Sequence, residues 1–345
     1  MVQRQRHAMS GPIVLTGASG FLGKRLAALL CEQGFAVRAV YRRPEPPPEL
    51  ASLAERGVAL IRADLDDEEG MKAALTGAQA VIHAAALARD WGPASAFKSS
   101  NVDATLRLLK AARAAGAQEF VFVSSISVHG FGSHKASSEE GPYYPLSHLY
   151  PRSKLEAEQA VLAENGPGFS ACSLRLGYIF GPGDTTSSYR MFDAARRGAF
   201  GWIGSGRNRT SMVYVDDAAQ ALASALGKPT VAGQAINVVG DETISWRDFA
   251  RAVYDAIGAS GRPIGVPKAL AWIGAALLSA GARVSGSIEG PPMTFYRVRR
   301  STVEYVFSNG KAKRLLGFAP RTGIREGLAL AAAAYNESLK RASSP

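Results

Sequence analysis

The sequence contains only two cysteines in 345 residues, Cys31 and Cys172, and no Cys/His cluster with the spacing of a metal site. This scarcity argues against a disulfide-stabilised secreted domain and against a structural zinc domain. We therefore expect two buried thiols, no bound metal and a reducing, cytoplasmic environment. Residues 1–10 contain no apolar stretch, so they do not form a secretory signal, and we expect a disordered extension there.

Acidic residues are scarce toward the end of the chain. The formal net charge is +11, and residues 261–345 contribute most of it, with 13 lysines and arginines against 4 acidic residues. No nucleic-acid module with interleaved aromatic residues accompanies these charges, so we predict no nucleic-acid partner. A solvated basic surface is the ordinary interpretation, and attraction to an anionic membrane or a phosphate-bearing ligand is the alternative.

The chain also lacks an apolar run long enough to span a bilayer. Residues 269–282, between Lys268 and Arg283, are fourteen positions without a charged residue. A buried helix is the ordinary interpretation of this segment. The alternatives are a helix lying on a membrane surface and a helix lining a pocket for an apolar substrate. We carry the peripheral membrane contact as a hypothesis, and the sequence leaves a homodimer open.

Strand-like apolar runs alternate with helical patterns in the first half of the chain. Strands are predicted at 13–15, 36–41, 58–61, 80–83 and 120–123, and helices at 101–115 and 150–164. This alternation predicts an α/β fold with a doubly wound parallel sheet. We assign 11–175 and 211–239 to the sheet domain, and 176–210 and 240–345 to a smaller domain at the sheet's carboxyl edge, where ligands bind in such folds.

A glycine-rich turn follows the first predicted strand. Gly17 suits the backbone of a tight turn, Gly20 lets a phosphate approach the main chain, and Gly23 lets the next helix pack closely on the strand. The start of that helix presents free N–H groups and the positive end of its dipole. A strand, a turn and a helix in this order predict a pyrophosphate site.

Two polar patterns predict proton-transfer chemistry. Tyr150 and Lys154 are four residues apart and therefore share one face of the helix predicted at 150–164. A phenol with a pKa of about 10 is a reluctant base, and a neighbouring Lys⁺ lowers that pKa by favouring the phenolate. Ser124 and Ser125 follow the strand predicted at 120–123, where a hydroxyl can donate a hydrogen bond to a developing alkoxide.

With these features in this order, the sequence resembles the extended short-chain dehydrogenase/reductase family over nearly all of its length. The resemblance rests on TGASGFLG at 16–23, RADL at 62–65, VIHAAA at 81–86, NVDAT at 101–105, VSSISVHG at 123–130, YPRSK at 150–154, LRLGYIFGPGD at 174–184 and SMVYVDDAAQAL at 211–222. It implies a Rossmann-type NAD(P)-binding domain, a substrate-binding domain and an oxidoreductase acting on CH–OH and C=O groups.

The same resemblance implies roles for individual residues. Ser125 is expected to polarise the carbonyl, Tyr150 to be the acid/base, and Lys154 to activate Tyr150 and anchor a ribose. Asn101 completes this catalytic set by supporting the site from its helix. The expected cofactor contacts are Gly17, Ser19, Gly20, Phe21, Leu22, Gly23, Arg42, Arg43, Asp64, Leu65, Ala84, Ala85, Ala86, Ser124, Tyr150, Lys154, Leu176 and Ile179.

Arg42 and Arg43 follow the second predicted strand, where an NAD site usually offers an acidic residue to the ribose hydroxyls. A guanidinium suits a 2′-phosphate instead, so we predict NADP(H) as the preferred cofactor and NAD(H) as the alternative. The resemblance places Asp64 and Leu65 at the adenine.

Segments 91–93, 269–282, 291–294 and 307–318 together resemble the 3β-hydroxysteroid and sterol-4-carboxylate dehydrogenase branch. We predict an apolar steroid- or sterol-like substrate, contacted by Trp91, Ser125, His129 and Tyr150. His129 and Leu176 depart from the family pattern, since many members have tyrosine and proline there. The alternatives are a nucleotide-sugar epimerase or dehydratase, and a dihydroflavonol-reductase-like or β-keto-acid reductase. An NADP-sensing binding protein, the non-enzyme alternative, would be expected to lose Tyr150 or Lys154.

Overall fold

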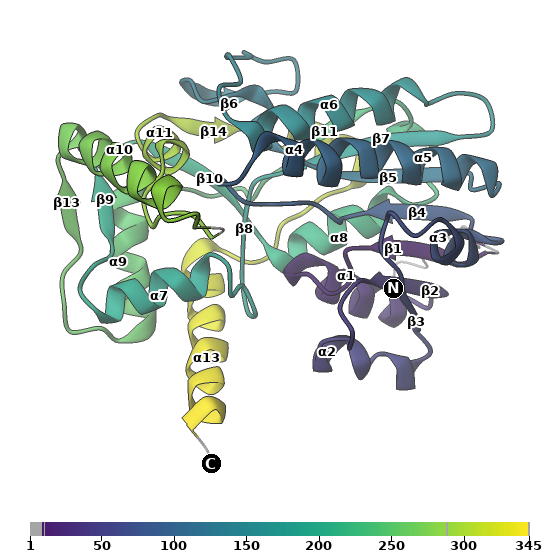
Figure 1. Cartoon of the computed structure of the whole chain (residues 1–345), viewed down its shortest axis with the longest axis horizontal. Coiled ribbons are helices and arrows are strands. Elements are labelled where there is room, and N and C mark those ends of the chain that lie inside the picture. The colour runs from purple at the N-terminus through teal and green to yellow at the C-terminus, as the bar shows by residue number, and fades with distance from the viewer. Residues whose placement is uncertain (1–8, 10, 288, 344–345) are drawn as a thin grey trace.

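The computed structural model describes residues 9, 11–287 and 289–343, and Figure 1 shows the arrangement of its elements. Seven parallel strands form the main sheet in the order β11-β7-β5-β4-β1-β2-β3. They are β1 (Ile13–Thr16), β2 (Val37–Tyr41), β3 (Ala59–Arg62), β4 (Ala80–His83), β5 (Glu119–Ser125), β7 (Ser170–Leu176) and β11 (Ala235–Val238). The strand order changes direction between β1 and β4, which confirms the predicted doubly wound sheet.

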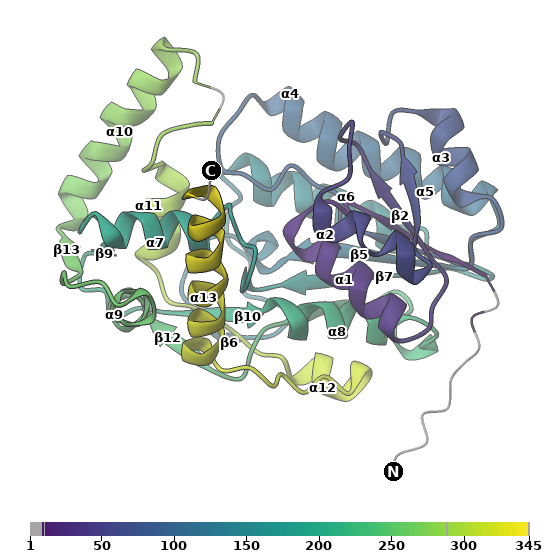
Figure 2. The same ribbon diagram turned by 90° about the horizontal axis from the view of Figure 1, so that it is seen from below.

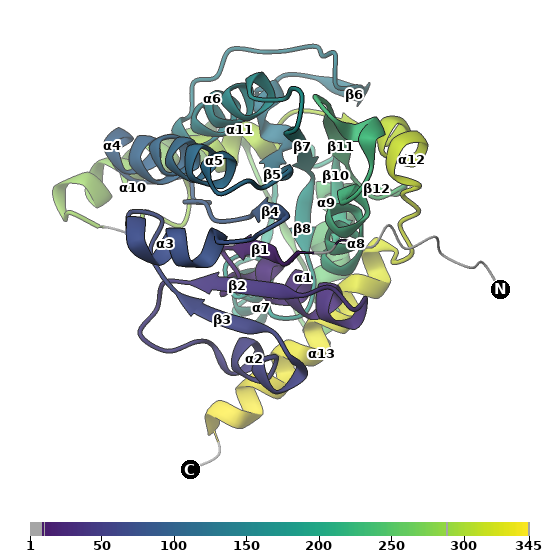
Figure 3. The same ribbon diagram turned by 90° about the vertical axis from the view of Figure 1, so that its right-hand side faces the viewer.

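Helices cover both faces of this sheet, as Figure 3 shows. One face packs against α1 (Phe21–Glu32), α8 (Val215–Ala225) and α12 (Gly310–Leu316). The other face packs against α3 (Glu68–Leu75), α5 (Ala104–Ala114) and α6 (Leu149–Ala163). Shorter elements complete this part: α2 (Pro48–Ala51), α4 (Ala94–Phe97), a π-helix (Lys98–Asp103) and 3-10 turns at Ala54–Arg56, Ile126–His129 and Pro229–Val231.

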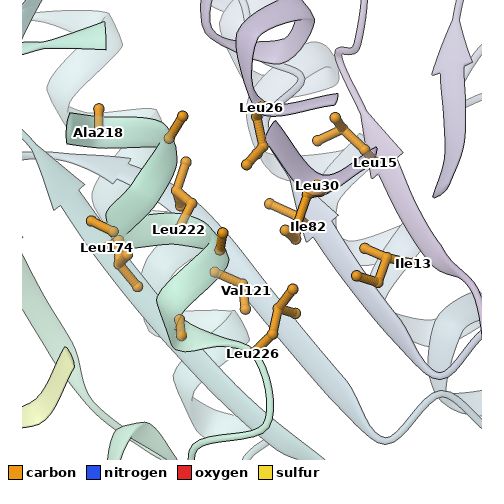
Figure 4. Close-up of a cluster of buried hydrophobic side chains, with 14 of the residues drawn as sticks. Ile13, Leu15, Leu26, Leu30, Ile82, Val121, Leu174, Ala218, Leu222 and Leu226 are labelled. Carbon is orange, nitrogen blue, oxygen red and sulfur yellow. The ribbon is translucent and has the colours of Figure 1, made fainter. Parts of the chain in front are cut away.

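Successive side chains of a strand contribute to the hydrophobic core on opposite faces of the main sheet. Ile13 and Leu15 belong to the cluster on the α1 and α8 side, whereas Val14 between them belongs to the cluster on the α3 and α5 side. Figure 4 shows Leu26 of α1 and Leu222 of α8 in the first of these clusters. Successive side chains of a strand point to opposite faces, so an all-apolar strand fits only between two helical layers.

The second part of the chain is built on smaller sheets. Four strands are ordered β12-β10-β14-β6, β8 also pairs with β10, and β13 pairs separately with β9. These strands are β6 (His134–Ser137), β8 (Tyr178–Phe180), β9 (Gly201–Ile203), β10 (Arg209–Tyr214), β12 (Thr243–Ser245), β13 (Ile264–Val266) and β14 (Tyr305–Phe307). The helices are α7 (Ser188–Arg196), α9 (Trp246–Ile257), α10 (Lys268–Val284), α11 (Phe295–Ser301) and α13 (Ile324–Ser343).

The structure divides the chain differently from the sequence-based assignment at two points. β10, expected in the main sheet, pairs with β8, β12 and β14 instead. α12, expected in the smaller domain, packs Ala312 and Leu316 into the core of the main sheet. Apolar patterns show that both segments are buried elements, but they do not identify the partners.

Several local expectations can be compared with the described residues. Of the extension predicted at 1–10, only Met9 is described. Cys172 is buried, and burial raises the pKa of its thiol to about 12, whereas Cys31 is only half-buried. Within 9, 11–287 and 289–343, no helix is long and apolar enough to cross a membrane. The uncharged segment 269–282 forms most of α10, whose large apolar side chains face outward, so its interpretation as a buried helix is wrong.

Candidate active site

The carboxyl ends of four neighbouring strands meet at one edge of the main sheet, and most of the predicted site residues lie there. Gly17 follows β1, Arg42 follows β2, Ala84 follows β4, and Ser125 is the last residue of β5. This edge is where doubly wound sheets bind their ligands.

The glycine turn is shaped by close backbone approach. Gly17 has a φ of +71°, and a Cβ there would lie 2.6 Å from the backbone nitrogen of Ala85. A Cβ on Gly23 would lie 2.1 Å from the carbonyl oxygen of Gly17, so the first turn of α1 packs directly on the turn that precedes it. A side chain at either position would separate these segments, which explains why both are glycine.

The start of α1 is open to an anionic group. Gly20 precedes the helix without a side-chain cap, and the first helical turn contains no acidic residue. The backbone N–H of Ala18 donates to the carbonyl oxygen of Val40 over 3.2 Å and ties the turn to β2. The first N–H groups of a helix have no intrahelical acceptors and form the positive end of its dipole, so this turn fits a pyrophosphate.

Arg42 and Asp64 are brought together from different strands. Nη1 of Arg42 lies 3.7 Å from Oδ2 of Asp64; the Arg42 side chain is largely exposed and that of Asp64 is half-buried. Arg43, also exposed, makes no ion pair among the described residues. The two residues predicted at the 2′-phosphate and the adenine therefore share one corner of the site.

Tyr150 lies at the start of α6, and its phenol is next to the Ser125 side chain. Burial raises the pKa of Tyr150, the hydroxyl of Tyr296 raises it further, and the interaction with Ser125 opposes the shift. The expectation of a lowered pKa is therefore wrong for the chain by itself, because removing the phenol from water outweighs the opposing effects of Ser125 and of the Arg300 cation. In this state Tyr150 holds its proton and can donate it.

Lys154 lies one helical turn after Tyr150 and is almost completely buried. Its Nζ is 3.9 Å from the centroid of the Phe122 ring on β5. Burial lowers the pKa of Lys154 to about 7, while the carboxylate of Glu158, a further turn along α6, raises it. The ammonium therefore titrates close to neutral pH in the chain by itself.

Asn101 connects the elements around this pair. Its Oδ1 accepts from the backbone N–H of Leu87 over 2.6 Å, and its Nδ2 donates to Oγ of Ser153 over 2.9 Å. Ser153 in turn donates to the carbonyl oxygen of Tyr150. The π-helical turn that carries Asn101 thus links the segment after β4 to α6, and the supporting role of Asn101 in catalysis stays a prediction.

This geometry agrees with the comparisons with known proteins. A model of the NAD-dependent epimerase/dehydratase family matches residues 13–239. This chain belongs to that family. It is 32% identical to the 2-alkyl-3-oxoalkanoate reductase of Stenotrophomonas maltophilia, over 92% of this chain and 97% of that protein. It is 30% identical to a 3β-hydroxysteroid dehydrogenase/isomerase of Mycobacterium tuberculosis, over 90% of this chain and 86% of that protein.

A solved structure of a protein in complex with UDP-glucuronic acid and NAD has a TM-score of 0.75 and 27% sequence identity, covering 95% of this chain and all of that one. This protein is thus an NAD(P)-dependent oxidoreductase of the epimerase/dehydratase family. The glycine cradle and the open start of α1 fit the cofactor's pyrophosphate, and the buried hydroxyl of Ser124 has no hydrogen-bond partner among the described residues. When bound, the nicotinamide would supply or accept the hydride.

His129 is completely buried, so its ring presents no surface to a ligand. Its Nε2 accepts from Nη1 of Arg175 over 3.0 Å, and its ring stacks on Tyr143. Arg175 also forms a buried ion pair with Glu158 at 2.7 Å. The predicted substrate contact through His129 is therefore not supported, and the residue belongs to the network behind Lys154.

Trp91 connects the active-site edge to the smaller sheets. Its Nε1 donates to the carbonyl oxygen of Ser287 over 2.9 Å, and the guanidinium of Arg283 lies 5.6 Å above its ring. The adjacent Asp90 pairs with Arg297 over 2.9 Å. The segment after β4 therefore holds both the end of α10 and the start of α11.

The remaining predicted cofactor residues differ in exposure. Leu176 is buried in the core beneath α8, so its side chain is not available to a ligand. Phe21, Leu22 and Ile179 pack partly against one cluster of the smaller sheets. The others line the edge as half-buried or exposed residues: Ser19, Leu65, Ala84, Ala85 and Ala86.

Sequence reasoning missed the role of His83 at the end of β4. Its Nδ1 lies 2.7 Å from Oγ1 of Thr16, its Nε2 lies 2.9 Å from Oγ1 of Thr105, and Thr105 donates to the carbonyl oxygen of Asn101. Burial lowers the pKa of His83 to about 3, so the ring is neutral. A histidine ending an otherwise apolar strand was the available signal for this connection between β1, β4 and the Asn101 turn.

Two residues of α11 were also missed. Tyr296 contacts the ring of His148, two residues before Tyr150, with centroids 5.3 Å apart. Arg300, one helical turn later, holds its guanidinium 4.4 Å above the ring of Tyr178 and influences the pKa of Tyr150. In the sequence, Arg300 is one of several basic residues in 297–300, and nothing in that pattern distinguishes it from its neighbours.

Proposed function

We propose that this protein interconverts a ketone and a secondary alcohol with NADP(H), on an apolar substrate that carries a carboxylate two carbons from the reacting carbon. A 3-oxo or 3-hydroxy acid on an alkyl chain and a sterol with a carboxylate at C4 both have this arrangement. The observation that carries the proposal is Arg300, a half-buried cation beside the catalytic edge that forms no ion pair among the described residues.

The position of Arg300 supports a role in recognising an anion. Its guanidinium lies over the ring of Tyr178 and 6.0 Å from that of Trp246, which restricts it without neutralising it. The neighbouring Arg297 and Arg299 are already engaged, with Asp90 and with the carbonyl oxygen of Phe131. Arg300 is the cation of α11 that retains its charge-assisted donors for a ligand, and a planar guanidinium suits a carboxylate.

The names of the relatives support the same substrate class. A 2-alkyl-3-oxoalkanoate has its ketone two carbons from its carboxylate, and relatives from Arabidopsis thaliana are 3β-hydroxysteroid dehydrogenase/decarboxylases. A ketoreductase from Stigmatella aurantiaca, 30% identical over 91% of this chain, acts on a farnesyl-bearing ring system. These names favour an apolar substrate over a nucleotide sugar.

The chain's own residues account for the proton step of the reduction. Ser125 donates a hydrogen bond to the carbonyl oxygen and polarises it, because its hydroxyl ends β5 beside the phenol of Tyr150. Tyr150, whose raised pKa keeps it protonated, gives its proton to that oxygen as the alcohol forms. Lys154, one helical turn after Tyr150, stabilises the phenolate that is left when Tyr150 gives up its proton. Oxidation runs through the same residues in reverse.

A substrate panel tests this proposal. With NADPH, we expect the protein to reduce a 2-alkyl-3-oxoalkanoate faster than the methyl ester of the same acid. The panel also includes UDP-glucose, and a 3β-hydroxysteroid with and without a C4 carboxylate, assayed with NADP⁺. Turnover of UDP-glucose alone, or equal turnover of acid and ester, would overturn it.

Variants of α11 sharpen the test. In Arg300→Met the KM for the acid should rise about 10- to 100-fold, the value of one lost charge-assisted hydrogen bond, with the ester unaffected. Arg299→Met is the matched control, because Arg299 is the neighbour of Arg300 in the sequence and donates to the backbone carbonyl oxygen of Phe131. Equal losses on acid and ester would show that Arg300 acts on the fold instead.

A further inference from the structure

We propose that the exposed face of α10 docks on the surface of an anionic lipid membrane, lying in the plane of the interface. The helix lies at one end of the molecule, on the far side from β2 and α3, as Figure 2 shows. Nothing in the proposed reaction requires this surface, so the inference stands independently of the substrate.

The large apolar side chains of α10 point away from the protein. Leu270, Ile273, Leu277 and Val284 are 58%, 56%, 69% and 91% exposed. At 3.6 residues per turn these four positions fall within an arc of about 60°. We call them the α10 stripe.

The opposite face of the helix holds it on the protein. Ala271, Ala275 and Ser279 are buried, and the two alanines pack with Val298 of α11 in a small cluster. The helical spacing places these residues roughly 180° from the stripe. Small residues thus face inward and large apolar residues face outward, the reverse of an ordinary surface helix.

The charges around the stripe select an anionic surface. No aspartate or glutamate occurs between Asp255 and Glu289, whereas Arg262, Lys268 and Arg283 lie in that interval. Lys268 and Arg283 stand near the two ends of α10 and are exposed, although the Arg283 guanidinium also lies 5.6 Å above the Trp91 ring. Apolar side chains between flanking cations are what an interfacial helix needs to insert shallowly among acyl chains beneath anionic headgroups.

The size of the stripe favours a membrane over a second copy of the chain. A stable protein interface usually places about 20–30 residues on each side. The large exposed apolar side chains of α10 number five, Leu270, Ile273, Leu277, Leu278 and Val284, far fewer than such an interface needs. A bilayer can cover a surface one helix wide, because lipid adapts to its shape.

This docking would bring the active site close to lipid-dissolved molecules. The end of α10 is connected to the segment after β4 through the hydrogen bond from Trp91 to Ser287. Asp90 in the same segment holds α11, which carries Tyr296 and Arg300 to the catalytic edge. The segment after β4 therefore links the helix that would rest on lipid to the proposed active site.

Vesicle sedimentation tests the proposal on the full-length protein. We expect binding to phosphatidylglycerol-containing vesicles at low salt, weaker binding at high salt, and little binding to pure phosphatidylcholine. No binding to the anionic vesicles at low salt would overturn the proposal. Binding that is equally strong to both vesicles and insensitive to salt would overturn the role of the cations.

Matched variants separate the stripe from general surface effects. Ile273→Ser with Leu277→Ser should weaken anionic-vesicle binding by at least about tenfold, since the bilayer would no longer cover these two exposed apolar side chains. Leu106→Ser with Leu330→Ser, exposed leucines on other helices, should bind like the wild type. Lys268→Glu with Arg283→Glu should abolish the salt-sensitive part, whereas Lys110→Glu with Lys135→Glu should not.

Circular dichroism and NADPH binding show whether each variant is folded. If folded stripe variants bind vesicles as well as the wild type, the proposal is wrong. Light scattering tests the alternative that a second copy of the chain occupies this surface. A wild-type dimer that the stripe variants convert to a monomer, with no vesicle binding, would assign the stripe to a second copy and overturn the membrane proposal.

Discussion

Asn101 donates from its Nδ2 to Oγ of Ser153 over 2.9 Å, directly beside the predicted catalytic pair on α6. The same amide receives the N–H of Leu87 at its Oδ1 and donates to the Leu87 carbonyl oxygen. Both polar atoms of the buried side chain are therefore used within the protein. We predict that Asn101 is a positioning residue that sets the distance between the segment after β4 and Tyr150.

Replacing Asn101 with aspartate tests this role. Asn101→Asp can still accept from Leu87 but cannot donate to Ser153, and it buries a charge. We expect a stability loss of about 1–3 kcal/mol and a kcat that falls more than KM rises. Denaturant unfolding and steady-state kinetics measure the two effects. Asn336→Asp, an exposed partner of Arg196, should stay within about 0.5 kcal/mol of the wild type. An unchanged kcat in folded Asn101→Asp would contradict the role.

Removing the phenol hydroxyl should stop the reaction without releasing the cofactor. In Tyr150→Phe we expect turnover to fall by about 10²- to 10⁴-fold, since the proton donor is lost. NADPH affinity, measured by fluorescence titration, should change little. Tyr144→Phe is the control, because the Tyr144 hydroxyl bonds the carbonyl oxygen of Ser133 at the surface. Retention of most activity in Tyr150→Phe would refute the assignment.

The choice between the two nicotinamide cofactors should depend on Arg42. We expect Arg42→Ala to weaken NADPH binding about 10- to 100-fold and to leave NADH binding nearly unchanged, because only NADPH offers a 2′-phosphate. Arg56→Ala removes another exposed arginine, which pairs with Glu32, and should affect neither. Equal losses for both cofactors would show that Arg42 does not meet the phosphate.

The buried ammonium of Lys154 should make stability depend on pH. Its pKa is about 7 in the folded chain and about 10.4 when unfolded, so the unfolded state binds more protons between these values. Wild-type stability should therefore rise relative to Lys154→Met as the pH increases from 7 to 10, by up to about 1.4 kcal/mol per pH unit. Denaturant unfolding at several pH values measures the difference. Lys110→Met should give a curve parallel to the wild type; a parallel Lys154→Met curve would contradict the lowered pKa.

The buried ion pair between Glu158 and Arg175 should contribute more to the free energy of unfolding than an ion pair on the surface does. Glu158→Gln leaves the buried guanidinium of Arg175 without its counter-charge, and we expect a loss of about 3–5 kcal/mol. Glu164→Gln breaks the exposed pair with Arg113 and should cost less than about 1 kcal/mol. Thermal or denaturant unfolding compares the two. If both variants lost less than about 1 kcal/mol of stability, water would have to reach the guanidinium of Arg175.

The sequence predicted the features that depend on local backbone chemistry. Gly17 and Gly23 were identified because no other residue allows that turn and that helix approach, and the apolar strands were found because both their faces are covered. Tyr150 and Lys154 were placed on one face by helical spacing alone. Their roles, like that of Arg42, remain predictions.

Features that depend on partners distant in the chain were not predictable. The pattern at 209–214 indicates a strand, but only the structure shows that β10 pairs with β8 and β12. Residues 269–282 are apolar on every face, so no period could indicate which face is covered. The raised pKa of Tyr150 was missed because burial, its largest cause, comes from residues that are not its neighbours in sequence.

The edge position of β11 has a consequence for synthesis on the ribosome. Translation delivers β11 only after β8, α7, β9, β10 and α8 have been made, so the main sheet waits with the outer edge of β7 unpaired. Every residue of β7 except Ser170 is buried in the finished protein, and an unpaired strand edge that should be buried invites association with other chains. A nascent chain stalled before Ala235 should therefore depend on chaperones, and a fragment truncated there should not be an autonomous nucleotide-binding unit.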